Sequence, residues 1–91
     1  MESVTHFVID ASTGEEVDLN RSVEVEGFKA GDRIRYGGRC FSAVFGKEAV
    51  VMGFTENSKS FSGWMIWTMP DGQTGCHWTP AQFASRDLIK I

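Results

Sequence analysis

The stretch GWMIWTMPDGQTGCHWTP, residues 63–80, decides how this chain folds. Its first part, Trp64 to Met69, predicts a β-strand in which Thr68 is the only polar residue. The PDG that follows is typical of a tight turn, and QTGCHW continues as a second strand, so the stretch predicts a β-hairpin. A strand in a small antiparallel sheet usually turns one face to water, so an almost entirely apolar strand needs a cover on its second face.

Charge and composition argue against several classes of protein. The 91 residues carry 9 Lys and Arg against 12 Asp and Glu, a net charge of −3, which gives a nucleic-acid backbone little general attraction. No apolar run approaches the ~20 residues of a membrane-spanning helix, and the start MESVTHFVIDAS does not resemble a secretory signal. We therefore expect a cytoplasmic protein that binds no membrane.

The cysteines and histidines do not form a metal-binding motif. Cys40, Cys76, His6 and His77 lack the spacing of zinc ligands, so we expect no metal site. In a reducing compartment we expect both cysteines to be buried thiols. The alternative, if their strands are neighbours, is a disulfide between them.

Short β-rich runs separated by Gly, Asn and Asp recur along the chain, while helical periodicity is absent until the last fifteen residues. The sequence therefore predicts an all-β domain, with an N-terminal β-hairpin or arm in residues 1–30 and a barrel of about five strands in residues 31–91. In the arm, HFVID and EEVDL are expected to pair, and SVEVEGF to form an alternating strand. Before the last strand, DLIKI, we expect one short helical turn that Thr79 caps and Pro80 begins.

The order of these elements is similar to that of an SH3-like barrel: a strand, a long loop, three meandering strands, a helical turn and a last strand. The GDRIR opening, the VMGF strand end and the Pro before the helical turn also resemble the plasmid-encoded type II dihydrofolate reductases. That resemblance implies a tetramer of barrels that binds folate and NADPH in a shared central pore.

Carried over residue by residue, the resemblance implies pore-facing positions at Gly75, His77 and Thr79. It implies a core-side position at Trp78 and a ligand-contacting position at Tyr36. Each of the pore-facing and ligand-contacting positions carries a different type of residue from the family's, so NADPH-dependent reduction is the alternative and not the main expectation.

The turn at MPDG leaves two hairpin registers open. A three-residue loop with Gly72 in a bulge forms one core face and leaves Met65, Trp67 and Met69 outside. The residues of that core face are Trp64, Ile66, Cys76 and Trp78. A two-residue Asp71-Gly72 loop instead places Cys76 and Trp78 with Met65 and Trp67. The outer set is then Trp64, Ile66 and His77.

In both registers a Trp lies on the second face of the hairpin. The sequence is compatible with three kinds of cover for that face. A second copy of the chain is the cover we favour, the N-terminal arm of the same chain is another, and a ligand groove is the third. We therefore expect a self-associating binding module, a dimer or tetramer, that presents an aromatic and Met-rich groove to a small molecule or peptide. The expected binding residues are Met65, Trp67, His77, Thr79 and Tyr36.

We expect no catalytic residues and no cofactor in such a module, with NADPH required only under the reductase alternative. A second alternative is a barrel that binds nucleic acid through basic residues of the first barrel strand and the loop after it. These are Arg33, Arg35, Arg39 and Lys47.

Overall fold

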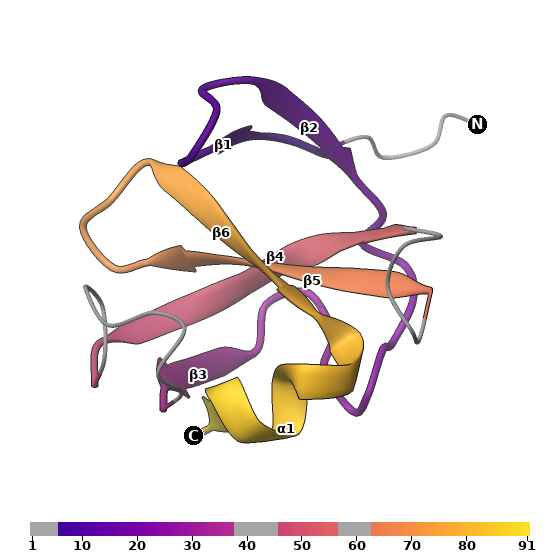
Figure 1. Cartoon of the computed structure of the whole chain (residues 1–91), viewed down its shortest axis with the longest axis vertical. Coiled ribbons are helices and arrows are strands. Elements are labelled where there is room, and N and C mark those ends of the chain that lie inside the picture. The colour runs from indigo at the N-terminus through magenta and orange to yellow at the C-terminus, as the bar shows by residue number, and fades with distance from the viewer. Residues whose placement is uncertain (1–5, 38–45, 57–62) are drawn as a thin grey trace.

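The computed structural model of the chain describes residues 6–37, 46–56 and 63–91. These residues form an all-β domain, as the sequence predicted, with a short helical segment before the last strand (Figure 1). The strands are β1 (His6–Asp10), β2 (Glu16–Leu19), β3 (Arg33–Tyr36), β4 (Glu48–Glu56), β5 (Trp64–Pro70), β6 (Gly75–Pro80) and β7 (Leu88–Lys90). The helical segment consists of η2 (Ala81–Phe83) and α1 (Ala84–Asp87). No helix among the described residues is long and apolar enough to cross a membrane.

The strands lie in one sheet in the order β2-β1-β6-β5-β4-β3-β7. From β3 to β6 the chain is an antiparallel meander, and β7 returns to pair with β3, with Ile34 opposite Lys90. This is the predicted order of elements. The N-terminal hairpin extends the sheet, because β1 pairs in parallel with the first two residues of β6.

One face of the meander closes around an apolar core, which includes Tyr36, Phe54, Ile66 and Leu88. The helical segment contributes Ala81 and Ala84 to this core. It also contains side chains that precede residue 31. These are Val25 and Phe28, with Val23 partly buried against them.

The strand predicted for SVEVEGF is not formed. Instead, Val25 and Phe28 exchange two backbone hydrogen bonds of 2.9 Å across a tight turn. Glu26 and Gly27, the central residues of this turn, have φ angles of 54° and 82°, the pair of positive values that a type I′ turn requires.

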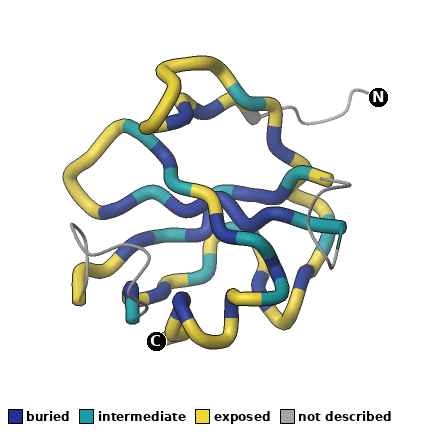
Figure 2. Tube along the Cα trace, viewed as in Figure 1, coloured by how far each residue is buried: buried dark blue, intermediate teal, exposed yellow. Residues whose placement is uncertain are grey.

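The N-terminal hairpin covers the second face of β5. Val8 and Leu19 pack with Met65, Trp67 and Cys76 in a second buried cluster. β5 is therefore buried along most of its length, as Figure 2 shows. Of the covers left open by the sequence, the structure shows the arm of the same chain, so the apolar strand is explained without a second copy.

The hairpin register differs from both predicted registers, but it puts Cys76 and Trp78 on the same face as Met65 and Trp67, as the alternative with a two-residue loop predicted. Trp67 lies opposite Trp78 and Thr68 opposite His77, which leaves a four-residue loop, residues 71–74. Gln73 donates its backbone N–H to the Pro70 carbonyl at 3.1 Å, so Pro70 is the first and not the second residue of the turn. Gly72, the third, has a φ of 80°, which a type II turn requires there.

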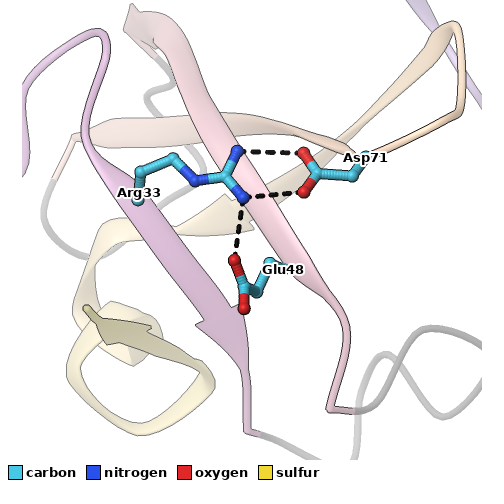
Figure 3. A network of polar contacts seen from close by, with 3 residues as sticks. All are labelled: Arg33, Glu48 and Asp71. Carbon is cyan, nitrogen blue, oxygen red and sulfur yellow. Dashed lines mark hydrogen bonds and ion pairs between the residues drawn. The ribbon is translucent and has the colours of Figure 1, made fainter.

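Asp71, the second residue of this turn, is bound by a side chain of β3. Arg33 donates two hydrogen bonds to the Asp71 carboxylate, at 2.7 and 3.0 Å, and a third to Glu48 at 2.9 Å (Figure 3). The Asp71 N–H also bonds the Glu48 carbonyl at 3.1 Å. These contacts bind the loop to the start of β4.

Candidate binding site along β6

Met65 and Trp67, two of the predicted binding residues, do not lie on an open face. Trp67 is only 4% exposed, and its indole N–H donates to the Thr55 hydroxyl at 2.8 Å. Both side chains belong to the cluster beneath the N-terminal hairpin. We predicted that these two side chains are exposed, and this was wrong because β1 and β2 cover that face of β5.

Tyr36 lies inside the barrel. Its phenol shares a hydrogen bond of 2.7 Å with the Thr68 hydroxyl, and burial raises the pKa of Tyr36 to about 12 against the opposing effect of that bond. Its ring meets the ring of His77 edge to face, with the centroids 6.5 Å apart. Tyr36 therefore supports His77 from the core side.

His77 and Thr79 do lie at a cavity. It has a volume of about 470 Å³ and follows β6 from Cys76 to Pro80. The end of β1 forms one wall with Asp10 and Ser12, and the helical segment forms another with Phe83 and Asp87. The structure thus brings together two of the predicted residues with groups from both ends of the chain.

Two exposed aromatic side chains form the apolar part of this cavity. Trp78 and Phe83 are each 41% exposed, a large solvent contact for residues of this size. The Arg86 guanidinium lies 4.7 Å from the centre of the Phe83 ring. Trp78 was expected on the core side from the resemblance. Strand alternation instead places Trp78 opposite Trp67 on the outer face, and Thr79 opposite Ile66 of the barrel core.

Thr79 is the one described residue whose buried side-chain oxygen has no hydrogen-bond partner. It is 1% exposed and lines the cavity. The sequence suggested that this hydroxyl caps the helical turn, but no side chain caps η2, and Pro80 precedes its first residue. A buried hydroxyl without a partner costs about 1–3 kcal/mol, so Thr79 is an unusual feature of this wall.

The charge of the cavity is acidic. Burial opposes ionisation of Asp10, but hydrogen bonds from Ser12 and Thr13 outweigh it and hold the pKa of Asp10 below its ordinary value of 3.8. The carboxylate of Asp87 pairs with Arg86 at 3.0 Å. Among the described residues that line the cavity there is no Lys or Arg, so a neutral or cationic group is favoured there over an anion.

Cys76 is a buried free thiol at the edge of the cavity. Burial and, to a smaller extent, the charge of Asp10 raise the pKa of this thiol to about 11. The thiol is therefore protonated at neutral pH, and it is a poor nucleophile and metal ligand. Cys40, the other cysteine, lies outside the described residues.

Other sites considered from the sequence find no support. In the described part of the chain no group of three or more His, Cys, Asp or Glu is placed to hold a metal ion. Of the basic residues proposed to bind nucleic acid, Arg33 is bonded to two carboxylates, and Arg39 lies outside the described residues. Comparison of the chain with protein-family models, curated proteins and solved structures finds no match.

Proposed function

We propose that this chain is a non-enzymatic binding module and that its ligand lies in the cavity along β6. The ligand presents an apolar group to Trp78 and Phe83 and a hydrogen-bonding atom to the Thr79 hydroxyl. That apolar group belongs either to a small molecule or to a side chain of a peptide. The proposal keeps the predicted kind of function but moves the groove from Met65 and Trp67 to the other side of β6.

The observation that carries the proposal is the cavity along β6, whose lining combines the exposed aromatic residues Trp78 and Phe83 with Thr79, a residue whose buried hydroxyl has no partner. A volume of about 470 Å³ lies in the range of small-molecule sites, which are mostly apolar with a few polar groups that orient the ligand. A ligand atom that bonds Thr79 removes the cost of its burial, so bound protein gains a hydrogen bond that the free protein lacks.

The acidic character of the cavity separates this proposal from the alternatives. NADPH, folates and nucleic-acid phosphates are anions, and they would have to approach the charged carboxylate of Asp10. Self-association was inferred from an exposed Met65 and Trp67. Because the N-terminal hairpin covers those residues, the proposal does not include an oligomer.

The test is an NMR screen of small aromatic fragments, neutral, amine-bearing and acidic, against the labelled full chain. We expect neutral and amine-bearing fragments to shift the amide signals of Trp78, Thr79 and Phe83. Thr79→Val should weaken such a fragment by about 2- to 10-fold, the value of one neutral hydrogen bond. Trp78→Ala should abolish binding.

Phe7→Ala is the matched control, because Phe7 is an aromatic residue 58% exposed on the outer face of the N-terminal hairpin. It should leave the affinity unchanged. If no fragment shifts the β6 signals, or if the Thr79 and Trp78 variants bind as well as the wild type, the cavity is not a binding site.

A further inference from the structure

β1 accompanies β6 only along the first two of its six residues. The two strands pair at Ile9 with Gly75 and at Asp10 with Cys76, and the last bond joins the Ala11 N–H to the Cys76 carbonyl at 2.9 Å. The Asp10 carboxylate then accepts hydrogen bonds from the N–H and hydroxyl of Ser12, at 2.8 and 2.7 Å. This turn directs the chain away from β6.

The second half of β6 therefore has an open edge at Trp78. Backbone groups of successive strand residues point to opposite edges, so Trp78 points to the same side as Cys76, where β1 has ended. His77 points the other way, toward β5, since its carbonyl lies 3.4 Å from the Thr68 hydroxyl. Among the described residues no strand lies beside Trp78 on this edge, and Pro80 has no N–H.

The cavity follows the same edge and has aromatic side chains next to the open backbone groups. We propose that an extended peptide segment with a basic side chain adds to the β6 edge at Trp78. This inference rests on the proposed function of the cavity and names its ligand. The peptide backbone exchanges two hydrogen bonds with Trp78, and its basic side chain lies between the rings of Trp78 and Phe83, near Asp10.

Charge complementarity selects the basic side chain. Asp10 and Asp87 line the cavity, but the Asp87 carboxylate is paired with Arg86 at 3.0 Å, so the attraction for a cation comes from Asp10, which is ionised at neutral pH. Of the lining residues in the described part of the chain, only His77 can carry a positive charge. A Lys or Arg stem packs on aromatic rings, and its cation is attracted both to their faces and to the carboxylate.

A second copy of the chain fits this edge less well. The outermost strand on the hairpin side of the sheet is β2, and it exposes Glu16 and Asp18, which would lie near Asp10 of the first copy. At the opposite end of the sheet, Lys90 of β7 is bonded to the Gly27 carbonyl and paired with Asp32. Two copies that each carry a net charge of −3 also repel one another.

The test starts from a phage-displayed library of random linear peptides, selected on the full-length protein and counter-selected on Trp78→Ala. We expect the selected peptides to contain Lys or Arg. A saturating selected peptide should slow hydrogen exchange of the Trp78 amide by more than about tenfold. When the backbone nitrogens of the peptide are methylated one at a time, methylation of the nitrogen that donates to the Trp78 carbonyl should abolish binding, and methylation of the nitrogens of the residues on either side, which point to the other edge, should not.

Asp10→Asn keeps an acceptor for Ser12 and removes the charge, so it should weaken a selected peptide by about tenfold, the value of a hydrogen bond to a charged group. Asp18→Asn changes the net charge by the same amount on the exposed face of β2 and should have no effect. Equal losses in the two variants would show that only the overall charge matters and would overturn the proposal.

The remaining outcomes separate this inference from the function on which it rests. Strand addition is overturned if aromatic fragments bind but no peptide does. It is also overturned if peptides bind but leave the Trp78 amide exchanging freely. In both cases the cavity is still a binding site. If hydrogen exchange of the Trp78 amide slows as the protein concentration rises in the absence of peptide, the occupant of the edge is a second copy of the chain. This result also overturns the inference. If neither fragments nor peptides bind, both proposals fail.

Discussion

Leu19 of β2 lies against Gly53 of β4 so closely that a Cβ atom at residue 53 would come within 2.7 Å of the Leu19 Cβ. Beside this contact, Asn20 and Phe54 exchange two backbone hydrogen bonds of 2.8 and 2.9 Å. The contact lies at the irregularity of β4 between Val51 and Gly53. The absence of a side chain at Gly53 thus allows the N-terminal hairpin to cover Met65 and Trp67.

Gly53→Ala should lift the hairpin from the sheet. A new Cβ would meet the Leu19 Cβ at 2.7 Å, the Leu19 Cδ1 at 3.1 Å and the Asn20 carbonyl at 3.2 Å, and of these the Leu19 Cβ and the Asn20 carbonyl move only with the backbone. We expect a loss of about 1–3 kcal/mol in the free energy of unfolding, measured in urea, and faster hydrogen exchange of the Asn20 amide.

Gly46→Ala is the control for this variant. Residue 46 has open space around it but a φ of 82°, so an Ala there costs about 1–2 kcal/mol of backbone strain without any effect on the hairpin. If exchange at Asn20 is equally fast in both variants, the contact with Leu19 does not hold β2 in place.

Deletion of residues 1–20 should make the chain self-associate. The deletion removes Val8 and Leu19 and uncovers Met65 and Trp67. Each large apolar side chain returned to water costs roughly 1.5–3 kcal/mol, which a second copy can recover by covering it. Light scattering after size-exclusion chromatography should give a larger mass per chain than for the full chain at the same concentration. An unchanged state of association would show that this face does not need a cover.

The sequence predicted the order of the elements because turn residues and strand-forming runs are local signals. It left the cover of β5 open because an apolar strand shows that both faces are buried but not by which segment. The register was wrong for a tertiary reason: Arg33 binds Asp71 from another strand, in a loop one residue longer than the Pro70-Asp71-Gly72 pattern suggests.

The candidate site was predicted only in part. His77 and Thr79 were predicted because the resemblance to the type II reductases implies that they are pore-facing positions of one strand. Phe83 gave a weaker signal, an aromatic residue in a helical turn that otherwise buries alanines. Asp10 could not be assigned, because its place beside Cys76 depends on the parallel pairing of β1 with β6, which no local pattern encodes.

Thr68 and Thr79 are buried threonines that face the core from β5 and β6. Their replacement by valine should have opposite effects on stability. Thr68 is bonded to the Tyr36 phenol at 2.7 Å, whereas the Thr79 hydroxyl has no partner in the described chain. Thr68→Val should therefore lower the free energy of unfolding by about 1 kcal/mol, because it removes this buried hydrogen bond to the Tyr36 phenol. Thr79→Val should be neutral or stabilising by up to about 1 kcal/mol.

Urea denaturation of the ligand-free proteins measures both values, each variant acting as the control for the other. A destabilised Thr79→Val protein would mean that the hydroxyl already has a partner in the free protein. That result would remove the argument that it is kept for a ligand.

The Arg33–Asp71 pair should make stability depend on pH in the acid range. Hydrogen bonds from Arg33 hold the pKa of Asp71 below its ordinary value of 3.8. A lowered pKa contributes stability that is complete above the unfolded-state value and is lost as the pH falls through the folded-state value. At neutral pH Asp71→Asn should be less stable than the wild type, and the difference should vanish below that range.

Because the pair is exposed to solvent, the difference at neutral pH should be small and should decrease at high salt. Thermal unfolding as a function of pH measures it, with Asp18→Asn as an exposed control. A difference between wild type and Asp71→Asn that persists unchanged in acid would show that the Asp71 side chain acts through its shape and not its charge.

Tyr36 should make the protein unstable in alkali. Burial raises its pKa from 10.0 to about 12, so the folded state keeps the phenol neutral where the unfolded state ionises it. Its contribution to stability is therefore complete below pH 10 and is lost between pH 10 and about pH 12. Tyr36→Phe cannot ionise at this position. Between pH 10 and about pH 12 its free energy of unfolding should therefore fall less steeply than that of the wild type. The difference between the two slopes should be up to about 1.4 kcal/mol per pH unit.

At neutral pH the order is reversed, since Tyr36→Phe loses the bond to Thr68 and should be about 1 kcal/mol less stable than the wild type. The two stability curves, measured in urea across pH 7 to 12, should therefore converge as the pH rises. Cys76, whose pKa is also raised by burial, titrates in both proteins, so its own titration largely cancels in the difference, while its charge contributes to the raised pKa of Tyr36. Parallel curves would show that the phenol is accessible to water in the folded protein, contrary to its position inside the barrel.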